Sequence, residues 1–276
     1  MALLNFIFCS TLFTLSAQTA DVQVSYDHTT IKPGNDTPQT NRMTLLANAT
    51  TSKYFNDISL WNDSLSATPE GKKQLQEIIM ATCMTQTPDG GITFDMRKGP
   101  VKTIHTYVFC TAADNNLRLY SKFGGEQCYY DEPLDEMQWQ IGDSTATILS
   151  YECIMAECDY HGRHWKAWFT PDIPLFFGPW KLRGLPGLIL KADADNGIGF
   201  SATGIEKSDR HITPMYSPQD YSKTSRKKAL ADDEYYRNNR ESIIRTKHGD
   251  VQFNYNPADR PLYDAARYAP EPDYTE

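Results

Sequence analysis

The chain has 276 residues, of which 40% are apolar and 12% aromatic, a composition typical of a globular protein with a sizeable core. Its 27 basic and 35 acidic residues give a formal net charge of -8 and a pI near 5.3. The apolar content excludes wholesale disorder. The negative net charge opposes a general nucleic-acid role, because phosphate binding needs a clustered excess of Lys and Arg.

The first 17 residues form an uncharged apolar stretch that ends in small residues before Gln18. This pattern predicts a signal peptide over residues 1–17, cleaved after Ala17, with a buried N-terminal strand as the alternative. The stretch is too short and too rich in Ser and Thr for a good membrane-spanning helix. We therefore expect an exported protein without a transmembrane segment in the mature chain.

Cleavage after Ala17 would leave five cysteines, an odd number that in an oxidising compartment permits at most two internal disulfides and one leftover thiol. A single extended strand from Cys153 to Cys158 would hold its ends about 16 Å apart, too far for these two to pair with each other. The pairing otherwise stays open. The five are Cys83, Cys110, Cys128, Cys153 and Cys158.

Strand patterns begin with the alternation of residues 22–26, and a second strand is expected over residues 43–47. A helix is predicted over residues 69–84, with Thr68 as N-cap and Pro69 in its first turn. Its apolar residues recur at helical spacing, so we expect this helix to pack against the concave face of a sheet.

From Val101 to about Ile205, apolar and polar residues alternate with period two, and short turns separate the alternating runs. Short connections make neighbouring strands antiparallel. The predicted fold is therefore mainly β with some α: a curved antiparallel sheet or half-barrel meander over residues 21–206, with one helix packed on it.

After Pro218 the chain becomes charged and helical. A C-terminal helical appendage is predicted over residues 217–247, and its thin apolar stripe makes docking on the sheet uncertain from sequence alone. Residues 257–276 contain four prolines and several acids, which predicts an extended or disordered tail.

The most distinctive segment runs from Trp165 to Leu190 and contains WKAWFTPDIP, GPWKLR and GLPGLIL. It resembles the GLPGLI family of exported proteins from Bacteroidetes-type bacteria, and the resemblance spans about residues 22–206. It implies a periplasmic or outer-membrane-associated location in a Gram-negative bacterium. The family has no established activity, so the resemblance implies no reaction and no cofactor.

Prolines in this segment fix φ and withhold hydrogen-bond donors, and its glycines permit close backbone approach, so we predict a rigid irregular crossing. Closure of a hydrophobic core and an exposed binding surface are both compatible with this pattern. The candidate ligand or partner surface consists of Trp165, Trp168, Phe176, Trp180, Leu185 and Pro186.

A metal site is the main alternative, because Cys158, His161 and His164 are close enough in sequence to converge across a turn. No Gly-x-Ser-x-Gly nucleophile motif is present, and no catalytic residue is nominated. The acid pairs around Glu132 fall in a predicted hairpin loop, where solvated carboxylates are ordinary. Asp172 is expected to form an ion pair with Arg163 or Arg183.

The leading hypothesis is a non-catalytic periplasmic or envelope protein that binds an apolar ligand or a partner protein in a groove of the curved sheet. Its motivation is the density of Trp, Phe, Leu and Pro in residues 169–190 of an otherwise polar exported chain. The alternatives are a metal-dependent or other hydrolytic enzyme and a structural component of an envelope assembly.

Overall fold

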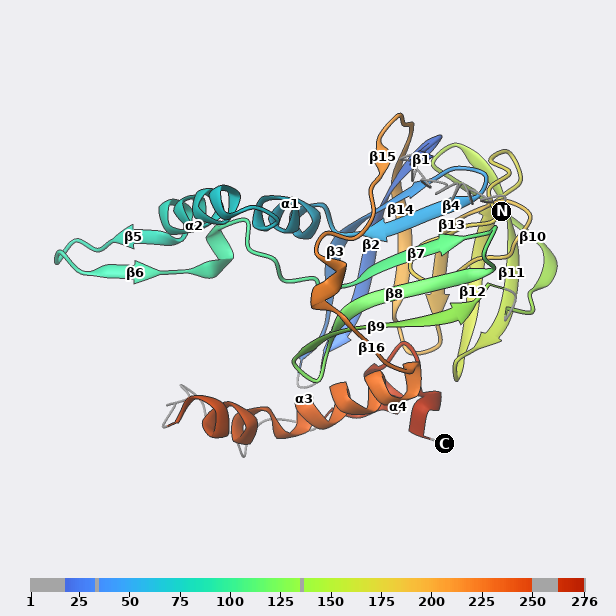
Figure 1. Ribbon diagram of the computed structural model, residues 1–276. Coiled ribbons are helices and arrows are strands. Elements are labelled where there is room, and N and C mark those ends of the chain that lie inside the picture. Colours follow the sequence, from blue (N-terminus) through green and yellow to red (C-terminus); the bar gives the residue numbers. More distant parts are fainter. Residues whose placement is uncertain (1–17, 33–34, 135–136, 250–262, 276) are drawn as a thin grey trace, which may run out of the picture.

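The computed structural model describes residues 18–32, 35–134, 137–249 and 263–275 (Figure 1). Its centre is a sheet of twelve strands in the order β10-β11-β12-β13-β14-β2-β3-β4-β7-β8-β9-β16. The strands are β2 (Val22–Lys32), β3 (Asn35–Ala47), β4 (Thr51–Phe55), β7 (Tyr107–Thr111), β8 (Asn116–Phe123), β9 (Glu126–Pro133), β10 (Gln140–Ile148), β11 (Tyr151–Tyr160), β12 (Arg163–Thr170), β13 (Leu188–Ala194), β14 (Gly199–Lys207) and β16 (Ser222–Lys223).

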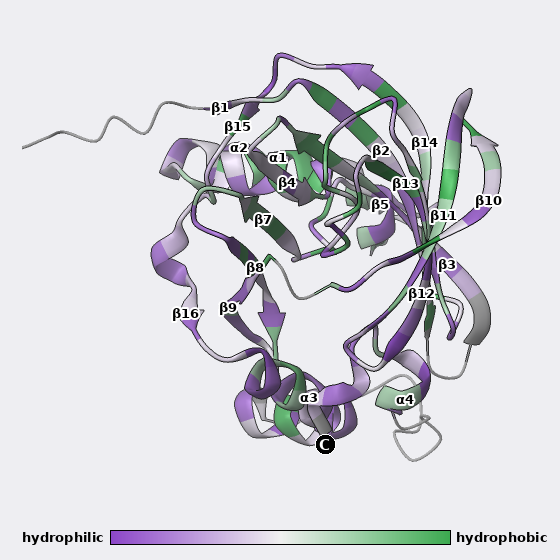
Figure 2. Ribbon diagram, turned by 90° about the vertical axis from the view of Figure 1, so that its right-hand side faces the viewer, coloured by the Kyte–Doolittle hydropathy of each residue, from purple (hydrophilic) through white to green (hydrophobic). Residues whose placement is uncertain are grey.

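All neighbours in this sheet are antiparallel except β16, which runs parallel to β9. The sheet is open and curves strongly, with β10 and β16 at its two edges (Figure 2). A second, two-stranded sheet joins β1 (Gln18–Thr19) to β15 (His211–Ile212). The mainly β fold with a curved, largely antiparallel sheet is therefore confirmed.

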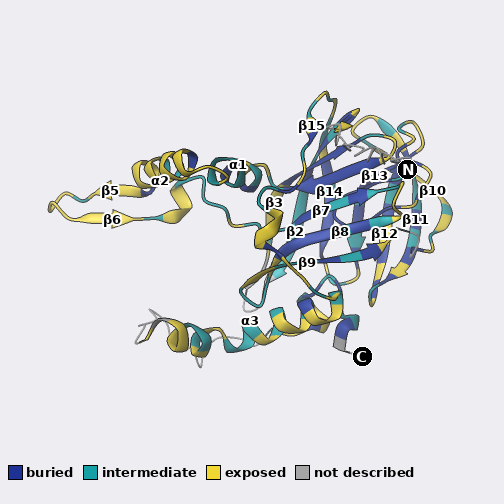
Figure 3. Ribbon diagram, viewed as in Figure 1, coloured by how far each residue is buried: buried dark blue, intermediate teal, exposed yellow. Residues whose placement is uncertain are grey.

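In the central sheet, alternation places one side of a strand in the core, as β12 shows. On β12, Trp165, Ala167 and Phe169 are buried, and Lys166 between them is exposed. The buried strand residues form a continuous layer through the sheet (Figure 3). Because successive side chains of a strand point to opposite faces, a period-two sequence directly produces this half-buried sheet.

The segment between β12 and β13, residues 171–187, is here called the crossing segment. Phe177, Trp180 and Leu182 are buried in the main core, so the crossing is packed with its own side chains. A Cβ on Gly187 would lie 2.2 Å from the carbonyl oxygen of Thr170, so only glycine permits this close backbone approach. The sequence-predicted irregular crossing therefore closes the core.

Two helices and a hairpin form an arm that projects from the sheet (Figure 1). The arm, residues 57–98, comprises α1 (Asp57–Ser66), α2 (Pro69–Cys83), β5 (Met84–Gln86), β6 (Ile92–Phe94) and the short 3-10 helix η1 (Met96–Lys98). Thr68 caps α2 by accepting a hydrogen bond from the Gly71 amide, as the sequence predicts.

The expected packing of α2 on the concave face differs from the structure. In α2 only Gly71 and Cys83 are buried, and the helix lies beside the β5–β6 hairpin, away from the sheet. Leu75, Ile78 and Ile79 are half-buried within the arm. Helical spacing identifies an apolar stripe, but it does not identify the surface that covers the stripe.

The helix that packs on the sheet is α3 (Arg226–His248), which follows the 3-10 helix η2 (Pro218–Asp220). It lies against the β8–β9 turn, where a Cβ on Gly125 would come within 3.1 Å of the Tyr236 ring. None of the described helices is long and apolar enough to cross a membrane. The predicted helical appendage is therefore present and in contact with the sheet.

The end of the chain differs from the expected extended or disordered tail. Residues 263–275, here called the tail segment, contain α4 (Ala265–Tyr268) and the 3-10 helix η4 (Pro272–Thr275). Ala265, Ala269, Glu271 and Tyr274 are buried. The composition of this segment predicted disorder, because composition does not show that side chains of α3 and of the sheet contact the tail segment. The remainder of the predicted tail lies outside the described residues.

The predicted signal segment, residues 1–17, also lies outside the described residues. The five cysteines expected in a mature chain are free thiols in the structure. Cys153 and Cys158 both lie on β11, in agreement with the expectation that one extended strand holds them too far apart to form a disulfide with each other. The prediction of internal disulfides is therefore not borne out by the arrangement of these residues.

Candidate functional site

The six residues of the sequence-predicted binding surface do not form one exposed patch. Trp165, Trp180 and Leu185 are buried in the main core, Trp168 and Phe176 are half-buried, and Pro186 is exposed. The Trp165 ring lies 5.8 Å from that of Trp180 and 6.0 Å from that of Phe200, measured between centroids. Aromatic side chains of the protein itself thus fill the space where an apolar ligand was expected.

The three residues of the predicted metal group also separate. Cys158 is buried on β11, and His164 is exposed on β12, where its Nδ1 lies 2.9 Å from Asp159. His161, in the β11–β12 turn, instead faces Glu132 and Asp273. Adjacent positions in a hairpin point to opposite faces of the sheet, so closeness in sequence did not bring these side chains together.

A cluster of buried charges lies where β9, the β11–β12 turn, the crossing segment, α3 and the tail segment meet. At its centre, Lys181 has a fully buried side chain whose Nζ lies 2.7 Å from Glu132 and 2.8 Å from Glu271. We call it the charge cluster; its members are Glu132, His161, Lys181, Arg226, Glu271 and Asp273.

Arg226, at the start of α3, links the remaining acids of the charge cluster. Its Nη1 and Nη2 donate to the two carboxylate oxygens of Asp273 at 2.7 and 2.9 Å, a bidentate arrangement. Nη1 also lies 3.1 Å from Glu271, and Nε lies 3.3 Å from Glu132. His161 completes the network with Nε2 3.0 Å from Glu132 and Nδ1 3.2 Å from Asp273.

The crossing segment positions Lys181 through a second buried cation. Arg183 is almost fully buried and donates from Nη1 to the Lys181 carbonyl at 2.6 Å and from Nε to the Leu134 carbonyl at 3.0 Å. Arg163 likewise donates to backbone carbonyls of the tail segment. The expected ion pair of Asp172 with Arg163 or Arg183 is absent from the described contacts of these residues. Backbone oxygens bind both guanidinium groups, and Arg163 also pairs with Asp195 at 3.5 Å.

The neighbouring cations determine the ionisation of the acids. Burial alone would raise the pKa of Glu132, but the hydrogen bond from His161 and the charge of Lys181 outweigh burial and lower this pKa to about 2. Burial likewise opposes ionisation of Asp273, and Arg226 lowers its pKa below the usual range. Both carboxylates are therefore charged at neutral pH.

Glu132, His161 and Glu271 have ligand atoms within 4.8 Å of one another and, among the described residues, are spaced as a metal site would be. The Lys181 ammonium, however, already lies between the two carboxylates, and Arg226 contacts both of them. A divalent cation there would face two fixed positive charges at close range. The geometry favours an internal salt-bridge network over metal binding.

A cavity of about 850 Å³ lies between the β8–β9 turn and α3. Its lining combines basic, acidic and aromatic residues, including Lys122, Lys223, Cys128 and Tyr236. Lys223 is paired with Asp131 at 3.1 Å. This cavity is not beneath the crossing segment and is not the apolar groove that the sequence predicts.

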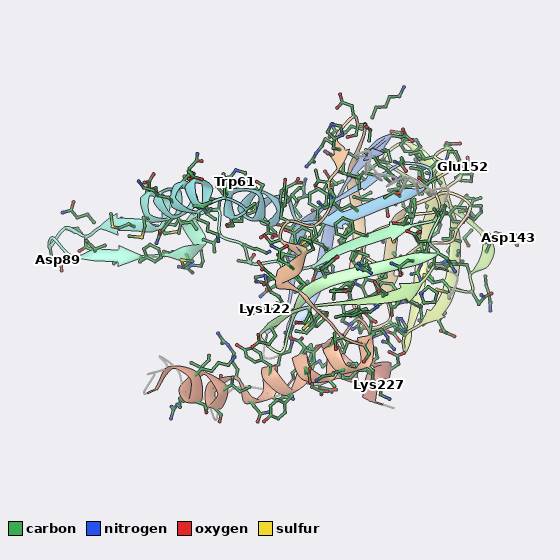
Figure 4. The ribbon with its side chains drawn as sticks, viewed as in Figure 1. Trp61, Asp89, Lys122, Asp143, Glu152 and Lys227 are labelled. Carbon is green, nitrogen blue, oxygen red and sulfur yellow. The ribbon has the colours of Figure 1, made fainter. Side chains whose placement is uncertain are left out.

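The arm carries most of the exposed apolar surface. Of the ten large apolar side chains that are exposed among the described residues, seven belong to it. Figure 4 labels Trp61 on α1 and Asp89 at the tip of the hairpin. The seven are Ile58, Trp61, Met80, Met84, Ile92, Phe94 and Met96.

The β5–β6 hairpin has two chemically different faces. Met84 lies directly opposite Phe94, and Ile92 is two residues away on the same strand, so these three side chains share one face. Thr85 and Thr93 pair on the other face. Both faces are exposed, and on the apolar face Met84, Ile92 and Phe94 are exposed to 45%, 68% and 48%.

A short stretch of the chain, away from the arm, is similar to a known family. A model of the Porph_ging family, a family of unknown function associated with Porphyromonas and other Bacteroidetes, matches residues 161–191. This short stretch contains the crossing segment and supplies His161, Arg163, Lys181 and Arg183. No curated protein matches the chain.

Two solved structures of PNGF-II are similar to part of the fold. One, in space group P21, has 14% sequence identity and a TM-score of 0.49, and the alignment covers 80% of this chain and 34% of that chain. The other, in space group C2, has 13% identity and a TM-score of 0.48, with 78% and 33% covered. This chain thus spans about a third of the length of PNGF-II.

Sequence reasoning missed both the charge cluster and the apolar face of the arm. Lys181 and Arg183 stand inside the apolar run of the crossing segment, and this placement was the signal that these cations are buried. The alternation Ile92-Thr93-Phe94 was the corresponding signal for the hairpin. Neither signal identifies a partner.

Proposed function

We propose that this protein is a non-catalytic, exported envelope protein of the GLPGLI type that binds a partner protein through its arm. The observation that carries the proposal is the exposed apolar face of the β5–β6 hairpin. Met84, Ile92 and Phe94 line it without cover from any described residue that would bury them. Contiguous exposed apolar surface of this kind marks interaction sites in soluble proteins.

The hairpin offers hydrogen bonds as well as apolar contact. It has only two strands, so the outer edges of β5 and β6 carry unpaired backbone groups among the described residues. An added strand or an apolar helix of a partner would cover these edges and the apolar face together. Methionines at three of the seven exposed positions suit an adaptable contact surface.

The crossing segment supports the partner version over the apolar-ligand version. Trp165, Trp180 and Leu185 are buried in the main core beneath it, which argues against a small apolar ligand there. The N-terminal sequence pattern supports export, and a periplasmic or outer-membrane-associated site remains part of this proposal.

Site-specific photo-crosslinking in the native host tests the function. A photo-reactive amino acid at Phe94 is expected to yield one discrete adduct with another protein. The matched control places it at Ile141, which is exposed to 54% on β10 but lies outside the arm. Ile92→Asp should abolish the Phe94 adduct without lowering the amount of folded protein.

Absence of a discrete adduct at Phe94, or the same adduct at Ile141, would contradict the proposal. An adduct between two copies of this chain would replace the partner protein by self-association. Uptake of an apolar fluorophore by the purified protein, unaffected by Ile92→Asp, would favour the ligand version instead.

A further inference from the structure

The tail segment is held in the manner of a bound peptide. Asn238 on α3 accepts a hydrogen bond from the Tyr263 amide at 2.7 Å and donates to the Tyr263 carbonyl at 3.3 Å. Arg163 donates to the carbonyls of Ala266 and Ala269 at 2.6 and 2.8 Å. Side chains that bind backbone groups in this way recognise the path of a chain independently of its sequence.

Two acidic side chains supply the sequence-specific part of the contact. The Glu271 carboxylate contacts Lys181 and Arg226. The Asp273 carboxylate accepts hydrogen bonds from both Nη atoms of Arg226 and lies within hydrogen-bond distance of His161. Next to them, the Tyr274 hydroxyl donates to Glu234 on α3 at 3.0 Å. The recognised pattern is therefore Glu, any residue, Asp, Tyr.

The residues that hold the tail segment in place form a surface that is here called the cradle. Its turn glycine, Gly162, approaches the tail so closely that a Cβ there would lie 3.0 Å from Cγ of Pro272. The cradle consists of Glu132, His161, Gly162, Arg163, Lys181, Arg226 and Asn238. Its three permanent cations face one buried carboxylate, Glu132, so it attracts acidic groups.

The tail segment is separate from the apolar core of the sheet. Its buried apolar residues, Ala265, Ala269 and Tyr274, form a cluster of their own with Leu230 and Tyr263 packed against it. The main core contains no residue of the tail segment. Removing the tail segment would therefore uncover the charged cradle and the Tyr130 hydroxyl, but it would take no apolar residue out of the main core.

We propose that the cradle is a peptide-binding site for an acidic segment of a partner protein with the pattern Glu-x-Asp-Tyr, and that the tail segment occupies it as an exchangeable internal ligand. Charge complementarity selects this occupant, because two carboxylates two positions apart match Lys181 and Arg226. The site is distinct from the apolar hairpin of the arm, so the two proposals stand or fall separately.

Peptide exchange on the full chain tests this proposal. A specific protease site placed within residues 250–262 allows the linkage to be cut while the tail segment remains present. A fluorescent peptide with the sequence of residues 263–275 is then added, and its anisotropy is measured. We expect it to replace the resident tail segment, with far-UV circular dichroism of the cut protein unchanged.

The control peptide carries Glu271→Gln and Asp273→Asn and should bind at least about tenfold more weakly, because it keeps the backbone contacts and loses both charges. On the protein side, Arg226→Ala should weaken binding of the unmodified peptide by a similar factor. Lys228→Ala, on the same helix but paired with Asp232, is the matched control and should leave binding unchanged.

Equal binding of the two peptides, or no uptake by the cut protein, would overturn the proposal and make the tail segment a fixed part of the fold. Loss of folded structure after cleavage would overturn it as well. Dimers of the intact chain that disappear in Arg226→Ala would identify the occupant as a second copy and overturn the assignment to a different protein.

Discussion

The tail segment and the arm both lie outside the main core, but acidic side chains of the tail segment are paired within the molecule and apolar side chains of the arm are exposed. The tail segment brings Glu271 and Asp273 into contact with buried cations, and each charge has a partner inside the molecule. The arm exposes Met84, Ile92 and Phe94 on one face of a hairpin. The polar contacts of the tail segment are completed within the chain, whereas the apolar face of the hairpin is left exposed by the described residues.

Lys181→Met should have the largest effect, because it leaves Glu132 and Glu271 buried without the ammonium between them. We expect a loss of about 3–5 kcal/mol in the free energy of unfolding, measured by urea denaturation. Lys166→Met removes an exposed pair with Glu157 and should cost no more than about 1 kcal/mol. Equal losses would show that the charge cluster contributes nothing beyond a surface ion pair.

Acid should weaken the charge cluster through Glu132. Its pKa is lowered to about 2 in the folded state, so its stabilisation is present above the usual Glu pKa and is lost as pH falls toward 2. The loss should approach about 3 kcal/mol between pH 6 and pH 2. Chemical denaturation across this range should show a shallower slope for Glu132→Gln, and an unchanged slope would contradict the assignment.

Lys53 sharpens the comparison, because it is a buried lysine without a carboxylate at ion-pair distance among the described residues. Burial, then the charge of Arg210, lowers its pKa to about 7. The unfolded chain holds the proton to higher pH, so stability should rise by about 2 kcal/mol from pH 7 to pH 9. Lys53→Met should abolish this rise in urea denaturation, and persistence of the rise would assign it to another group.

Two glycines with positive φ, Gly162 in the cradle and Gly90 in the arm, allow a direct comparison of the two regions. Gly162→Ala and Gly90→Ala both impose a left-handed backbone on alanine, at a cost of about 1 kcal/mol each. Only the Cβ at Gly162 meets the tail segment, since nothing lies within 4 Å at Gly90. Hydrogen exchange in residues 263–275 should therefore accelerate in Gly162→Ala alone, and equal acceleration in both would break the comparison.

The smallest effect on stability is expected in the arm. Ile92→Asp changes an exposed side chain and should alter the free energy of unfolding by less than about 0.5 kcal/mol in urea. Its effect should fall on partner crosslinking instead. A loss of several kcal/mol would mean that the apolar face is covered within the folded chain.

Particular residues show how far sequence reasoning reached in the candidate site. The turn at His161 and Gly162 was predicted, and φ is positive at both. Glu132 was assigned to a solvated loop, but β9 extends to Pro133 and buries it. Its burial depends on Lys181 and on the tail segment, and Lys181 and Glu271 are 90 positions apart in sequence. Local patterns carry no information on such distant pairing.

The sequence by itself determined the strands, the cap of α2 and the irregular crossing, because alternation, capping and the constraints of proline and glycine act over a few residues. The tertiary structure alone decided that α2 projects with the arm, that the aromatic residues of the crossing fill the core, and that the tail segment enters the cradle. These outcomes depend on which distant surfaces meet, and burial and electrostatic pairing become defined only when they do.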